Sequence, residues 1–122
     1  MDEVFFFDSY AFFEIIKGNK NYEPYLNSNI ITTKLNLFEL YFGLLKEFNE
    51  EKAIFSLNNY YSFAADFDKL DIEEAAKLKL KLNKRNVSMT DCIGYAVASK
   101  LGIRFLTGDK EFENLSNVEF VK

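Results

Sequence analysis

The sequence lacks histidine altogether and contains one cysteine, Cys92, which limits the chemistry open to its side chains. Without histidine, neither a Ser-His-Asp triad nor a Cys-His pair can form. One cysteine excludes an internal disulfide and leaves too few ligands for a structural zinc site, so we interpret Cys92 as a small buried residue. Any metal ion bound here must be held by oxygen atoms, which suits hard cations such as Mg²⁺, Mn²⁺ or Ca²⁺.

Long apolar runs are also missing, and none approaches the roughly 20 residues of a membrane span. The first four residues, MDEV, are acidic rather than basic, which is not the pattern of a secretory signal. We therefore expect a soluble cytoplasmic protein. The 122 residues are 48% hydrophobic and 17% aromatic, so we expect a single domain, residues 1–122, with a core that needs no disulfides.

An excess of positive charge is absent too. The net charge is −4 and the sequence pI is about 4.9. Because dedicated non-specific nucleic-acid binders are usually basic, the bulk charge argues against that class. A cluster of acids that binds cations would nevertheless produce the same composition.

Strands and helices alternate along the chain. Apolar or β-branched runs predict strands at residues 3–7, 29–34, 63–70, 103–107 and 117–121, and helical patterns cover 9–17, 35–48, 50–62, 71–85 and 87–102. Between them, residues 18–24 are predicted to be a loop and residues 108–115 a turn with a short helix. This alternation predicts an α/β fold with a mostly parallel, five-stranded sheet flanked by helices.

Two acids, Asp8 and Asp109, directly follow predicted strands. Sites in parallel sheets form beyond the carboxyl ends of the strands, where both residues are expected. Asp8 is also a good N-cap for the next helix, and Asp109 follows Gly108 in a turn, where aspartate is ordinary. Local sequence therefore leaves a structural and a chemical role open for each.

Glu39 lies in an apolar helical segment, "NLFELYFGLL". A lone carboxylate in such surroundings is costly unless it has a partner, although a solvated helix edge would explain it as well. Asp91 matches the capping-box pattern with Ser88, with aspartate in place of glutamate or glutamine. The run "DFDKLD" lacks the glycine and closing glutamate of a calcium loop, so an EF-hand is rejected.

The order of these acids carries more information than any one of them. An apolar strand ending in Asp8, then Glu39 in E-x-x-x-G, then Asp91 in "TDCIGYAVASKLG" and Asp109 in "FLTGD" resembles the PIN-domain family. The resemblance covers nearly the whole chain and is closest to the small VapC-type toxin ribonucleases. It implies a three-layer sandwich with its acids gathered at one end of a central sheet.

The resemblance also implies function. It assigns Asp8, Glu39, Asp91 and Asp109 as catalytic, metal-binding acids, with Ser9 and Thr107 in support. It implies Mg²⁺- or Mn²⁺-dependent cleavage of RNA, an antitoxin protein as partner, and a homodimer.

Elementary chemistry points the same way, because without histidine a metal must activate the water that attacks a phosphodiester. Two alternatives remain at this stage. One is a non-catalytic PIN-like module that binds RNA or protein. The other is a phosphotransfer domain of receiver or dehalogenase type, although Tyr10 stands where a dehalogenase needs its second acid.

Overall fold

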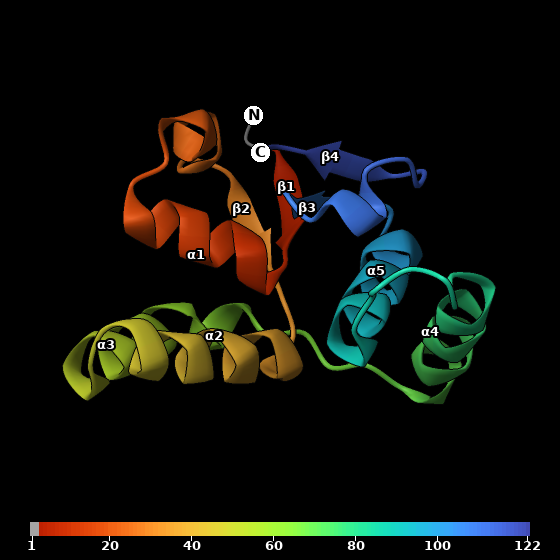
Figure 1. Ribbon diagram of the computed structural model, residues 1–122, viewed down its shortest axis with the longest axis horizontal. Helices are drawn as coiled ribbons and strands as arrows, with labels where there is room; N and C mark the ends of the chain where they lie inside the picture. The colour runs from red at the N-terminus through yellow and green to blue at the C-terminus, as the bar shows by residue number, and fades with distance from the viewer. Residues whose placement is uncertain (1–2) are drawn as a thin grey trace.

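The computed structural model describes residues 3–122 and shows a parallel sheet between two groups of helices (Figure 1). The strand order is β2-β1-β3-β4, and every pairing is parallel. The strands are β1 (Val4–Phe7), β2 (Asn29–Ile31), β3 (Arg104–Thr107) and β4 (Val118–Phe120). The α-helices are α1 (Ser9–Lys17), α2 (Lys34–Glu47), α3 (Glu50–Tyr60), α4 (Lys69–Lys81) and α5 (Met89–Leu101).

Alternation along the central strand creates the three layers. Phe5 and Phe7 point to the face covered by α1, α2 and α3, where they join the core with Leu40 and Leu44. Phe6 points to the opposite face and packs with Phe105 against α5. Successive side chains of a strand alternate between faces, so a strand buried on both sides can be apolar throughout. The α/β three-layer prediction is confirmed.

The prediction of five strands is wrong, because residues 63–70 do not form one. The segment begins at the end of a short 3₁₀ helix, η2 (Tyr61–Phe63), and touches the sheet only through an isolated bridge from Thr32 to Ala64. Asp68 then caps α4 in a reciprocal capping box with Asp71. The two ends of the segment are thus committed to η2 and to the cap of α4, and only Ala64 pairs with the sheet.

The other boundaries agree with the sequence to within a few residues. The predicted loop at residues 18–24 is largely a 3₁₀ helix, η1 (Lys20–Tyr25), and a third one, η3 (Lys110–Phe112), fills the predicted turn. Helices α1 and α5 end at Gly18 and Gly102, both in the left-handed region, as their sequence signals predict. Within residues 3–122, no helix is long and apolar enough to cross a membrane.

Candidate active site

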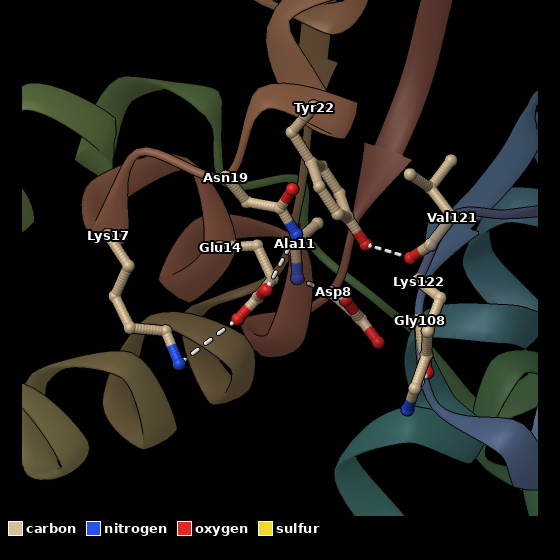
Figure 2. Close-up of polar contacts among 9 residues, drawn as sticks. All are labelled: Asp8, Ala11, Glu14, Lys17, Asn19, Tyr22, Gly108, Val121 and Lys122. Atoms are coloured by element: carbon tan, nitrogen blue, oxygen red, sulfur yellow. Dashed lines mark hydrogen bonds and ion pairs between the residues drawn. The ribbon is translucent and has the colours of Figure 1, made fainter.

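Asp8 follows the last residue of β1 and is 1% exposed. Its carboxylate accepts a hydrogen bond of 2.8 Å from the Ala11 backbone N–H, so it caps α1 (Figure 2). Burial raises the pKa of the Asp8 carboxyl well above its usual value, and the nearby Asp91 charge raises it further. The Thr107 hydroxyl and the capping bond lower that pKa but do not outweigh the burial. Asp8 is thus both a helix cap and an electrostatically strained acid.

Asp91 lies in the first turn of α5, where the Ser88 side chain accepts a hydrogen bond from its backbone N–H at 3.0 Å. Burial, followed by the charges of Glu39 and Asp109, raises the pKa of Asp91 to about 7. The cap predicted at Ser88 is therefore present. It does not account for the Asp91 carboxylate, whose surroundings are dominated by other acids.

Glu39 is brought to the same place by the packing of α1 on α2. The Ser9 hydroxyl lies 2.8 Å from Glu39 Oε1 and 3.1 Å from the Asn36 carbonyl oxygen. Gly43, one turn after Glu39, faces the Phe13 ring of α1, and a Cβ there would lie 2.4 Å from a ring carbon. Glycine in the E-x-x-x-G step therefore allows the two helices to approach, and this approach places Ser9 next to Glu39.

Asp109 is held by the turn that follows β3. Thr107 is fully buried, and its hydroxyl accepts a hydrogen bond of 3.0 Å from the Asp109 backbone N–H. A Cβ on Gly108 would lie 2.2 Å from the Tyr10 ring and 2.5 Å from the Val121 carbonyl oxygen. The "TGD" sequence thus fits a turn with room for only a backbone at its centre, and this turn carries the acid beside Asp8.

The sequence-predicted acids share one electrostatic neighbourhood. Asp8 responds to the charges of Asp91 and Asp109, and Asp91 responds to Glu39 and Asp109. They come from the end of β1, from α2, from the start of α5 and from the turn after β3. Asp91 couples electrostatically to each of the other three acids.

Comparison with known families decides the identity of this fold. The sequence model of the PIN domain matches residues 5–118, which is most of the chain. This chain belongs to the PIN-domain family. The likeness suggested by the order of the acids is confirmed, and it spans both the strand before Asp8 and the turn at Asp109.

Solved structures with the PIN fold align over almost their whole length. VapC20 of Mycobacterium tuberculosis, described as a sarcin-ricin loop cleaving toxin, gives a TM-score of 0.80 at 17% identity, covering 97% of this chain and 99% of its own. VapBC2 of Rickettsia felis, bound to promoter DNA, gives 0.73 at 18% identity, with 98% and 99% covered. FitAcB of Neisseria gonorrhoeae gives 0.71 at 16% identity, with 97% and 96% covered. At these identities the likeness establishes the fold. A search of curated proteins finds no match.

The donor chemistry of this PIN domain fits a divalent cation. All four acids offer oxygen, and a cation would relieve the burial and repulsion that raise the pKa of Asp8 and Asp91. Within residues 3–122, no three His, Cys, Asp or Glu side chains are close enough together to form a ready coordination shell. Mg²⁺ needs no such shell, since one or two carboxylates, water and substrate phosphate commonly complete its octahedron.

One polar residue of this region was not predicted from the sequence. Asn36, one turn before Glu39, is fully buried, and its carbonyl oxygen accepts from Ser9. Its side-chain oxygen accepts a 2.7 Å hydrogen bond from Thr33, while its Nδ2 has no hydrogen-bond partner among the described residues. A buried amide donor without a partner is costly. The backbone of Asn36 meets the site through its contact with Ser9. The sequence feature that could have indicated Asn36 is a polar residue one turn before Glu39 in an otherwise apolar helix.

Proposed function

We propose that this PIN domain is a metal-dependent endoribonuclease that hydrolyses phosphodiester bonds in single-stranded RNA or RNA loops. The observation that best supports this proposal is that four acids converge at one edge of the sheet, where the charge of Asp91 interacts with those of the other three. Perturbed carboxylates gathered in this way are more common in functional sites than in structural ones. A cluster of like charges around the buried Asp8 is hard to explain by stability alone.

The four acids share one task in this proposal, and neighbouring side chains orient them. Asp8, Glu39, Asp91 and Asp109 would hold Mg²⁺ or Mn²⁺, and such an ion, when bound, lowers the pKa of water and offsets phosphate charge. The chain itself supplies orientation. Ser9 fixes the Glu39 carboxylate, Ser88 positions the backbone of Asp91, and Thr107 positions that of Asp109.

The toxin–antitoxin assignment is also a proposal. It is supported by the likeness to VapBC complexes and to VapC20, which is described as a sarcin-ricin loop cleaving toxin. We propose a protein antitoxin that blocks the acidic site, a homodimeric state and a cytoplasmic location. Expression of the free chain in its host should slow growth, and a pull-down should recover a small companion protein. Harmless expression without a companion would point to a housekeeping ribonuclease.

The decisive experiment is cleavage of a labelled single-stranded RNA with Mg²⁺, Mn²⁺ or EDTA. We expect cleavage with either metal and none with EDTA, and equal cleavage in EDTA would refute the metal mechanism. Asp8→Asn keeps a capping side chain on α1 but should lower the rate by about 10²-fold or more, since it removes a charged ligand. Glu74→Gln, at an exposed acid of α4, is the matched control and should cleave normally.

A non-catalytic PIN-like module remains the second candidate, because no three carboxylates within residues 3–122 form a ready shell. That candidate predicts RNA or protein binding without cleavage under every metal condition. The match to the PIN-domain model leaves the phosphotransfer alternative without support from the fold.

A further inference from the structure

The positive charge of this acidic chain is concentrated in one place. Residues 77–85, "KLKLKLNKR", hold five of the fifteen lysines and arginines and no acid. This basic segment covers the end of α4 and the connection to α5, and all five cationic side chains are exposed. The net charge of −4 therefore hides a strongly positive strip beside a negative site.

Most of these cations are not neutralised by the protein. Lys77 lies 3.7 Å from Glu74, but within residues 3–122 none of the other four forms an ion pair. Lys79 and Arg85 donate hydrogen bonds to backbone carbonyl oxygens, which leaves their charge uncompensated. Uncompensated positive charge on a surface attracts a polyanion.

Two consecutive contacts join the basic segment to the acidic site. Arg85 Nη1 donates to the Glu111 carbonyl oxygen at 2.9 Å, and the Asp109 carboxylate accepts from the backbone N–H of Glu111 at 3.0 Å. Only Glu111 separates the guanidinium from the acid. The connection after Arg85 also leads directly to Ser88, which caps the helix that carries Asp91.

The surface between the segment and α5 is hollow. A groove of about 570 Å³ is lined by Lys79, Asn83 and Arg85 on one side and by Met89 and Ile93 of α5 on the other. Helices α4 and α5 lie side by side in Figure 1. The groove follows α4 from Ile72 to beyond its end and borders the start of α5. Cationic side chains beside the exposed Leu80 and Met89 suit a nucleic-acid strand, which presents phosphates and base faces together.

We propose that the basic segment binds the phosphate backbone of the single-stranded RNA substrate across the end of α4 and brings it to the neighbouring acidic site. Its cations lie on both faces of this helix end, because Lys79 and Arg85 line the groove whereas Lys77 and Lys81 line a second hollow between α4 and α5. The inference rests on the proposed function for the identity of its ligand. It explains how a chain of net negative charge holds RNA near four carboxylates. The repelling acids and the attracting cations are segregated on neighbouring elements, so affinity comes from one and chemistry from the other.

The test is the salt dependence of RNA binding by the full chain, measured by fluorescence anisotropy in EDTA so that cleavage does not interfere. The variant is Lys81→Gln/Lys84→Gln, because neither exposed lysine makes a hydrogen bond or ion pair within residues 3–122. Removing two phosphate contacts should lower the slope of log Kd against log salt by about 1.4, and raise Kd roughly tenfold near ~50 mM salt.

The control is Lys20→Gln/Lys46→Gln, which removes the same charge from exposed lysines on other elements and should leave the slope unchanged. Neither of these lysines forms an ion pair within residues 3–122. If both double variants lower the slope equally, the effect comes from net charge rather than from the basic segment, and the proposal is overturned. An unchanged slope in Lys81→Gln/Lys84→Gln would overturn it, as would no RNA binding by the wild type. A sedimentation coefficient that differs between this variant and the wild type would also overturn it, because the basic segment would then serve contact between copies of the chain. Binding is measured without metal, so it does not depend on cleavage. A protein that binds RNA through the basic segment but does not cleave it would contradict the proposed function and not this inference.

Discussion

Asp8 and Asp71 are both buried carboxylates at the start of a helix, yet their electrostatic surroundings are opposite. Asp8 is 1% exposed and Asp71 is 3% exposed. Asp8 caps α1 and faces the charges of Asp91 and Asp109, which add to the effect of burial and raise its pKa. No lysine or arginine within residues 3–122 forms an ion pair with it.

Asp71 shows how the same fold buries a carboxylate for structure. Burial acts to raise its pKa, but hydrogen bonds from Lys100 and from the Asp68 backbone outweigh it, so the pKa is lowered. The Lys100 ammonium lies 2.7 Å from the Asp71 carboxylate and ties α5 to α4. Asp71, which serves the fold, is paired, whereas Asp8, which we propose serves the site, is left to repel its neighbours.

Among the variants that test this contrast, Asp91→Asn is expected to change the stability of the fold most. The wild-type pKa of about 7 lies above the unfolded value of about 3.9, so the charged carboxylate destabilises the folded state. The variant should therefore gain stability without metal at pH 8. Roughly three pKa units correspond to about 4 kcal/mol, from which the cost of burying an amide is subtracted. Thermal melts across pH should show the gain growing between about pH 4 and pH 7 and then levelling.

The same variant should respond less to Mn²⁺, because metal stabilises the fold by mass action only where it binds the native site. If Asp91 served only the first turn of α5 beside Ser88, stability would be equal or slightly lower and the response to Mn²⁺ unchanged. Melts of both proteins, with and without Mn²⁺, separate these outcomes.

A smaller effect of opposite sign is expected from Asp71→Ala. It removes the capping-box bond of α4 and the contact with Lys100, and should cost about 2 kcal/mol at neutral pH, a figure reduced because Lys100 is half exposed. The Asp71 pKa is lowered in the fold, so this stability is present above the unfolded value of about 3.9 and is lost as the pH falls below it.

Urea unfolding of Asp71→Ala at two pH values tests this sign. Asp66→Ala, at an exposed acid of the preceding segment, is the control and should change stability little. RNA cleavage per folded molecule should remain normal in Asp71→Ala. A large loss of cleavage without loss of stability would show that Asp71 takes part in the reaction, and the contrast between the two carboxylates would then be wrong.

The smallest effect is expected from Ser9→Ala, which leaves all four acids in place. It removes the hydroxyl that contacts Glu39 and the Asn36 carbonyl, so Glu39 is free to turn away from Asp91. We expect about a tenfold loss of cleavage and about 1 kcal/mol of stability. Ser9→Thr, which keeps the hydroxyl, should recover most of the rate, and a fully active Ser9→Ala would show that Glu39 needs no support.

Local sequence rules predicted a large part of this molecule. The caps at Asp8 and Ser88 and the helix ends at Gly18 and Gly102 follow from interactions between residues a few positions apart. The alternation of Phe5, Phe6 and Phe7 between two faces follows from strand geometry alone. The order of the acids along the chain was enough to indicate the PIN-domain family, which the family model confirms. The assignment of those acids to catalysis stays a prediction.

Where the local rules failed, a distant partner decided the outcome. The run at residues 63–70 has the composition of a strand, but Asp68 is engaged in the capping box of α4, and a single bridge to Thr32 is all that reaches the sheet. In the sequence, Asp71 is one of several acids near the start of α4. Only the fold places Lys100, 29 residues away, beside it.

The sequence by itself determined which residues can end a strand, begin a helix or bind a hard cation, because those properties depend on residue type and on neighbours within about one helical turn. The tertiary structure decided which acids meet. Ser9 reaches Glu39 across 30 positions because Gly43 lets α1 approach α2, and Arg85 is joined to Asp109 through Glu111 because the basic segment passes over the turn after β3. Such contacts form only when whole elements pack, so their electrostatics are a property of the fold rather than of any segment.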